Sequence, residues 1–160
     1  MRTRGFSLLE TLMYIALFAL IMEGSFTGML AISELAERNQ TKAYLEEEAD
    51  FIITKVSYEI SNATTVSLSG PDATNTEINL TTAEGGNVSI ELSGSALVIA
   101  RGNNVGVPFS SSNVRTSKVA FATDSKDSSS PIYFAFSLQT ESASGKIVSE
   151  DFSAVSYPAL

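Results

Sequence analysis

Hydrophobic positions in this chain follow three successive patterns. Apolar residues run almost without a break over Phe6–Met22, and the apolar character continues to about Ile32. From Ser33 to about Asn62, apolar residues recur every three or four positions, as on one face of an amphipathic helix. This apolar stripe comprises Leu45, Ala49, Ile52, Val56 and Ile60. Because no proline interrupts residues 6–62, the first two patterns together predict one long helix.

The other positions of the amphipathic segment carry charges that we expect to face solvent. They are Glu34, Arg38, Lys42, Glu46, Glu47, Glu48, Asp50, Lys55 and Glu59. Glu34 and Arg38 lie four residues apart, in the order that stabilises a helix. The acidic run Glu46–Glu48 is most simply a solvated helix face, and a metal or partner site is the alternative interpretation.

Beyond the helix, apolar and polar residues alternate, which predicts β-strands separated by tight turns. We expect strands at Val66–Leu68, Ile78–Leu80, Val88–Leu92, Leu97–Ile99, Val114–Thr123, Ile132–Thr140 and Lys146–Tyr157. A looser stretch covers Gly102–Asn113. One strand face, which we expect in the core beneath the apolar stripe, consists of Ile132, Phe134, Phe136 and Leu138. A long helix followed by seven antiparallel strands belongs to the α+β class.

The apolar N-terminal segment predicts a membrane-spanning helix. Phe6–Met22 spans about 26 Å of helix, slightly less than a hydrocarbon core of about 30 Å, and the extension to Ile32 supplies the rest. Arg2 and Arg4 precede it, which favours a cytoplasmic N-terminus and an external C-terminal domain. A cleaved secretory signal with Leu12–Met22 as its core is the alternative, although residues 23–27 offer a poor cleavage site.

Two glycines interrupt the apolar helix in the spacing Gly-x-x-x-Gly. Gly24 and Gly28 could allow close approach of a second helix, or could simply weaken this one by about 1 kcal/mol each. Both interpretations mark the same place as a close-packed or flexible point of the helix.

Composition excludes several kinds of chemistry. The chain has 10 Lys+Arg against 18 Asp+Glu, a formal net charge of -8, and neither cysteine nor histidine. Disulfides, Cys/His zinc sites, thiol nucleophiles and histidine triads are therefore absent, and binding of nucleic acid over a broad basic face is not expected. No phosphate-binding loop or nucleophile elbow occurs, so we expect neither an enzyme nor a cofactor. The loop Asp124–Asp127 could offer oxygens to calcium, but its spacing is not that of an EF-hand.

The sequence Gly5-Phe6-Ser7-Leu8-Leu9-Glu10 resembles the processing motif of type IV prepilins and of type II secretion pseudopilins. The resemblance implies that a prepilin peptidase cuts between Gly5 and Phe6, that Phe6 is then N-methylated, and that Glu10 acts in assembly. The helix end at residues 53–63 resembles minor members of the J type. Unlike many major pilins, the chain has no cysteine pair to close a C-terminal loop.

The resemblance also implies an organisation for the whole chain. It divides the chain into a leader (1–5), a transmembrane half-helix (6–32), an amphipathic half-helix (33–62) and a soluble antiparallel β domain (63–160). The expected function is that of a structural subunit, anchored in the bacterial cytoplasmic membrane and assembled into a filament. Its expected partners are other pilin or pseudopilin subunits, the peptidase, the inner-membrane assembly platform and membrane lipid. The alternative is a membrane-anchored binding or adhesion module that does not form filaments.

Overall fold

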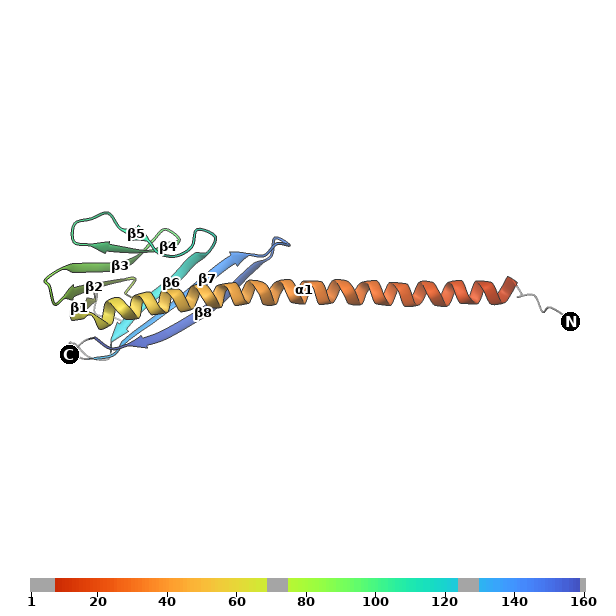
Figure 1. Ribbon diagram of the computed structural model, residues 1–160, viewed down its shortest axis with the longest axis horizontal. Helices are drawn as coiled ribbons and strands as arrows, with labels where there is room; N and C mark the ends of the chain where they lie inside the picture. The colour runs from red at the N-terminus through yellow and green to blue at the C-terminus, as the bar shows by residue number, and fades with distance from the viewer. Residues whose placement is uncertain (1–7, 69–74, 124–129, 159–160) are drawn as a thin grey trace. The chain divides into compact units, whose positions relative to one another are not determined.

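The computed structural model describes residues 8–68, 75–123 and 130–158 (Figure 1). The proposed cleavage site at Gly5 and Phe6 and the loop Asp124–Asp127 therefore lie outside the described residues. The chain forms two compact units, Met1–Asn39 and Gln40–Leu160. One helix, α1 (Leu8–Ser61), contributes to both units, and each unit is described by itself.

Helix α1 ends close to the predicted position, whereas its predicted start at Phe6 lies outside the described residues. Glu10 lies in its first turn, where a carboxylate interacts favourably with the positive end of the helix dipole. At the other end the carbonyl of Tyr58 accepts hydrogen bonds from the Asn62 backbone N–H at 3.2 Å and from the Asn62 side-chain amide at 2.9 Å. The Ser61 hydroxyl donates to the same carbonyl at 3.0 Å. These bonds satisfy a carbonyl that the helix end would leave without a partner.

The strands form two antiparallel sheets in the second unit (Figure 1). The first sheet has the order β1-β2-β3-β4-β5, with β1 (Ala63–Leu68), β2 (Glu77–Thr82), β3 (Asn87–Ser93), β4 (Ala96–Arg101) and β5 (Val107–Pro108). The second has the order β6-β7-β8, with β6 (Arg115–Thr123), β7 (Ile132–Glu141) and β8 (Ile147–Ser156). Neighbours in each sheet are neighbours in sequence, so both sheets are meanders of hairpins.

The sequence prediction differs from this arrangement in one strand. The stretch Gly102–Asn113, expected to be loose, contains the short strand β5, which pairs with β4 through Ile99 and Val107. A Cβ atom at Gly106 would lie 2.2 Å from Cγ1 of Val98. Only a glycine allows the chain to approach β4 this closely, so the pairing depends on Gly106.

The core of the second unit lies between the helix and the sheets. All five residues of the predicted apolar stripe are buried: Leu45, Ala49, Ile52, Val56 and Ile60. The predicted face of β7 is buried in the same cluster as this stripe. Aromatic rings extend the cluster across the second sheet, with centroids 6.3 Å apart for Phe121 and Phe134 and 6.2 Å for Phe134 and Phe136. The predicted α+β class and the predicted contact between the stripe and the sheet are therefore confirmed.

Candidate assembly surfaces

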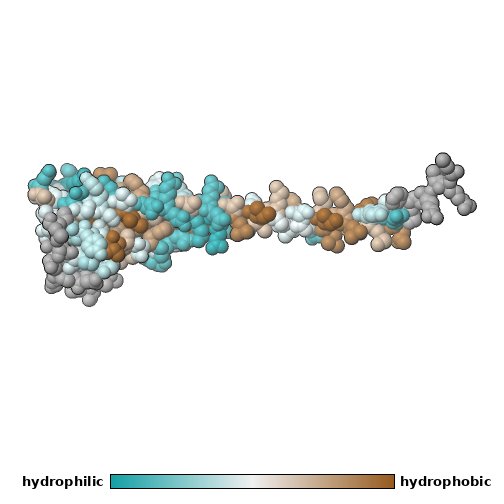
Figure 2. Space-filling view, turned by 60° about the horizontal axis from the view of Figure 1, so that its bottom comes forward, coloured by the Kyte–Doolittle hydropathy of each residue, from teal (hydrophilic) through white to brown (hydrophobic). Residues whose placement is uncertain are grey.

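The first unit presents an apolar surface along α1. Every residue from Leu8 to Ala36 is exposed in this chain, including Leu8 at 83%, Met29 at 72% and Leu20 at 70%. Figure 2 shows brown and tan surface recurring along this part of the helix. Among the described residues, α1 is the one helix long and apolar enough to span a membrane. Exposed apolar surface of this extent is typical of segments that contact lipid or other protein.

The polar side chains in this apolar segment fall into two kinds. The hydroxyls of Ser25 and Thr27 donate to backbone carbonyls one turn earlier, at 2.8 Å to Ile21 and 2.9 Å to Glu23. Hydroxyls bonded in this way are tolerated in an apolar environment. Two carboxylates differ from them, because Glu10 and Glu23 carry charge within the mainly apolar stretch of residues 8–32. A charge in such a segment is costly and points to a specific function.

The glycine pair occupies an open part of the helix. No atom lies within 4 Å of a Cβ built at Gly24 or at Gly28. Helix α1 is continuous through both positions. The two glycines thus lower the helix surface over one turn without breaking the helix.

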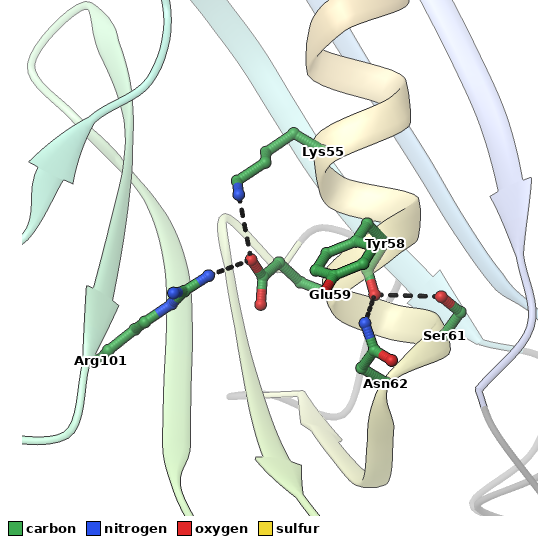
Figure 3. Close-up of polar contacts among 6 residues, drawn as sticks. All are labelled: Lys55, Tyr58, Glu59, Ser61, Asn62 and Arg101. Atoms are coloured by element: carbon green, nitrogen blue, oxygen red, sulfur yellow. Dashed lines mark hydrogen bonds and ion pairs between the residues drawn. The ribbon is translucent and has the colours of Figure 1, made fainter.

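Glu59 corrects a prediction. Expected on a solvated face, it is buried, with only 4% of its surface exposed. Its Oε1 accepts a hydrogen bond from Nη2 of Arg101 on β4 at 2.5 Å and pairs with Nζ of Lys55 at 3.4 Å (Figure 3). Two cations compensate the buried carboxylate, which explains why it is tolerated there. Since Glu59 follows Ile52 by seven residues, two helical turns place it on the same face as the apolar stripe.

Other charged residues expected in solvent also contact a strand or the loop between β5 and β6. Glu48 is half-buried, and its Oε1 accepts the backbone N–H of Ser111 at 2.5 Å. The hydroxyl groups of Tyr44 and Ser111 form a hydrogen bond of 3.1 Å. Lys42 forms an ion pair with Glu150 on β8. Of the acidic run, Glu46 and Glu47 are exposed as predicted.

Metal ligation has no structural support in the described residues, where no group of three or more Asp or Glu side chains could hold an ion.

The chain matches no protein-family model, no curated protein and no solved structure.

Proposed function

We propose that this chain is a structural subunit, of the minor kind, in a type IV pilus-like or type II secretion pseudopilus filament. The observation that supports it most strongly is the exposed apolar helix of the first unit with a carboxylate, Glu10, in its first turn. The motif around Gly5 and Phe6 adds a route by which the helix gains a new N-terminus.

Processing would change the electrostatics of the helix start. Cleavage after Gly5 removes Arg2 and Arg4 and leaves a methylated, positively charged amine on Phe6. In an apolar environment this amine and a neighbouring subunit's Glu10 are each costly alone and are compensated when paired. Desolvation cancels much of the attraction, so the pair selects a register between subunits more than it adds stability.

Assembly would then cover the apolar surface. Lipid covers it before assembly, and other subunits' helices cover it in the filament. Contacts between such helices depend on close packing, which the open surface at Gly24 and Gly28 permits. In this role the chain is a substrate of the peptidase and a building block, and not an enzyme.

Mass spectrometry of the full chain, made with and without a prepilin peptidase, tests the processing step. We expect the mature chain to begin at Phe6 and to carry one additional methyl group. An uncut chain beginning at Met1 in the presence of the peptidase would contradict the proposal.

Glutamate substitutions test the assembly step. We expect Glu10→Gln to reduce incorporation into filaments, measured as sheared or cross-linked assemblies, while Glu23→Gln has a much smaller effect. Glu23 is the matched control because it is also an exposed carboxylate on the apolar part of α1. Equal, unimpaired function in both variants would favour a membrane-anchored binding module that does not assemble.

A further inference from the structure

The second unit carries two exposed aromatic side chains on α1 that lie outside the core. Phe51 is 54% exposed and Tyr58 is 58% exposed. They are seven residues apart, so two helical turns place them on the same face. Thr54, also exposed, lies between them on that face. The buried stripe occupies a different side of the helix, and the aromatic pair therefore contributes nothing to the core of its own chain.

Acidic residues border this aromatic pair. Glu47 and Asp50 are exposed and lie one helical turn before Phe51 and Thr54, respectively. Neither carboxylate forms a salt bridge within the part of the chain that the structure describes. We call Glu47, Asp50, Phe51, Thr54 and Tyr58 the acidic–aromatic face.

The second sheet offers a surface of a different kind on the side away from its core. The strand register aligns four rows across β6, β7 and β8: Arg115–Gln139–Ser149, Ser117–Ser137–Asp151, Ala120–Ala135–Ser153 and Ala122–Tyr133–Val155. We call these rows the outer sheet face. Its middle consists of small side chains: Ala135 and Ser153 are exposed, Ala120 is half-buried, and Ser137 is buried and donates a hydrogen bond to Asp151. Tyr133 and Val155, 39% and 47% exposed, form an apolar end.

Two cations lie on β6: Arg115 in the first row of the outer sheet face, and Lys118 in the bulge between the second and third rows. Arg115 is exposed, and Lys118 is exposed between the buried residues Thr116 and Val119. Lys118 sits where the register shifts between Ser117 and Ala120 and has a φ of 51°. A left-handed lysine costs about 1 kcal/mol, and bulges of this kind redirect a side chain. Strand β6 is therefore locally strained at Lys118, and this lysine is exposed.

We propose that the acidic–aromatic face of one copy docks on the outer sheet face of a second copy. Charge complementarity supports a second copy as the partner, because Glu47 and Asp50 can pair with Arg115 and Lys118 while Phe51 covers Ala135. The acid of the receiving face, Asp151, accepts a hydrogen bond from Ser137 of its own sheet. A chain with a net charge of -8 repels itself unless its few cations meet its acids. This inference rests on the proposed function, since it supplies a contact between subunits of the filament.

The geometry makes the contact head-to-tail. Both surfaces belong to every copy and differ from each other, so the interface is heterologous. The outer sheet face measures about 20 Å by 10 Å, which is below the roughly 800 Å² per partner of a standard stable interface. The contact is therefore weak alone and gains strength when the apolar helices hold copies together at high effective concentration.

Cysteine cross-linking of the full chain in membranes tests the contact, since the natural sequence has no cysteine. Copies with Thr54→Cys and copies with Ala135→Cys, carrying tags of different size, are made together and oxidised. We expect a mixed cross-linked dimer. Thr54→Cys paired with Thr65→Cys, an exposed position on β1, is the matched control and should give little product. A dominant Thr54→Cys homodimer, or equal product with the control, would overturn the proposal.

Charge exchange tests the same contact at exposed positions that leave the core unchanged. In the cross-linking pair, E47K/D50K alone and R115E/K118E alone should each lower the yield about fivefold, as two surface ion pairs of moderate strength predict. Combining the two sets should restore the yield. If each charge exchange alone lowers the cross-linking yield and combining the two does not restore it, the two faces are not complementary in charge.

A third cross-link separates this inference from the proposed function. Leu17→Cys lies on the exposed apolar helix and reports assembly of helices. If Leu17→Cys dimers form while the Thr54–Ala135 product is absent, the docking proposal fails and the filament proposal stands. If neither product forms in a processed chain, both fail.

Discussion

Replacing Arg101 with methionine probes the buried carboxylate at the junction of α1 and β4. The change removes the 2.5 Å hydrogen bond to Glu59 and leaves Lys55, at 3.4 Å, as its remaining cation. Methionine keeps an unbranched apolar stem similar to that of arginine, so little packing is lost. The expected effect is a lower free energy of unfolding for the second unit.

The size of the effect follows from the environment of both partners. Removing one partner of a fully buried ion pair costs about 3–5 kcal/mol. Here the cost is smaller, because Lys55 remains and because the Arg101 side chain is 57% exposed, so that water screens part of the attraction. We expect a loss of about 1.5–3 kcal/mol, the range for a hydrogen bond to a charged group. For a domain of this size, that lowers Tm by about 5–10 °C.

Thermal unfolding of the full chain in detergent measures this loss. Near-ultraviolet circular dichroism reports the packing of tyrosine and phenylalanine, since the chain has no tryptophan. Arg115→Met is the matched control, because Arg115 is exposed and forms no salt bridge with another described residue. The double variant E59Q/R101M should be more stable than R101M, since no uncompensated charge remains. Equal Tm values for R101M and R115M, or no recovery in the double variant, would refute the reasoning.

Two further changes test the fold around this junction. Gly106→Ala places a Cβ 2.2 Å from Cγ1 of Val98 and should cost about 1–3 kcal/mol by overpacking. Amide hydrogen exchange at Ile99 and Phe109 should become faster. Unchanged exchange at these two residues would contradict the assigned close approach. Leu45→Ala empties a fully buried position and should cost about 2–5 kcal/mol in urea unfolding, whereas Leu35→Ala, 59% exposed, should change the unfolding midpoint very little. Equal losses in the two leucine variants would contradict the assigned core.

Much of the fold follows from periodicity. The apolar stripe of α1 and the inward face of β7 were predictable, because a buried face repeats at 3.6 or 2 residues. Periodicity identifies which face of a strand is buried, but not which strand it pairs with. The division into two sheets therefore had no signal in the sequence. Strand β5 had no signal in the sequence either. Its two residues are a strand because they pair with β4 at Ile99 and because Gly106 has no Cβ to clash with Val98.

The candidate surfaces show the same limit. Glu10 was predictable as a charge in an apolar run, because that conflict is visible in the sequence alone. The burial of Glu59 depends on Arg101, 42 positions later, so spacing could place it beside the stripe without revealing its partner. The outer sheet face required the register, which brings Ser117, Ser137 and Asp151 into one row. The exposed pair Phe51 and Tyr58 did have a sequence signal, namely two aromatic residues seven apart and off the stripe.

The two kinds of surface have different physical consequences. An apolar helix associates strongly but without direction, since many rotations and shifts bury similar area. Charged groups add little to the net free energy of association. They discriminate sharply between registers of neighbouring copies, because a carboxylate in the wrong register has no cation to compensate it. On this reasoning Glu10 would set the axial position of one apolar helix beside another. The contact between Glu47, Asp50, Arg115 and Lys118 would set which face of the second unit each neighbour meets. Loss of either should therefore disorder an assembly before it abolishes membrane anchoring.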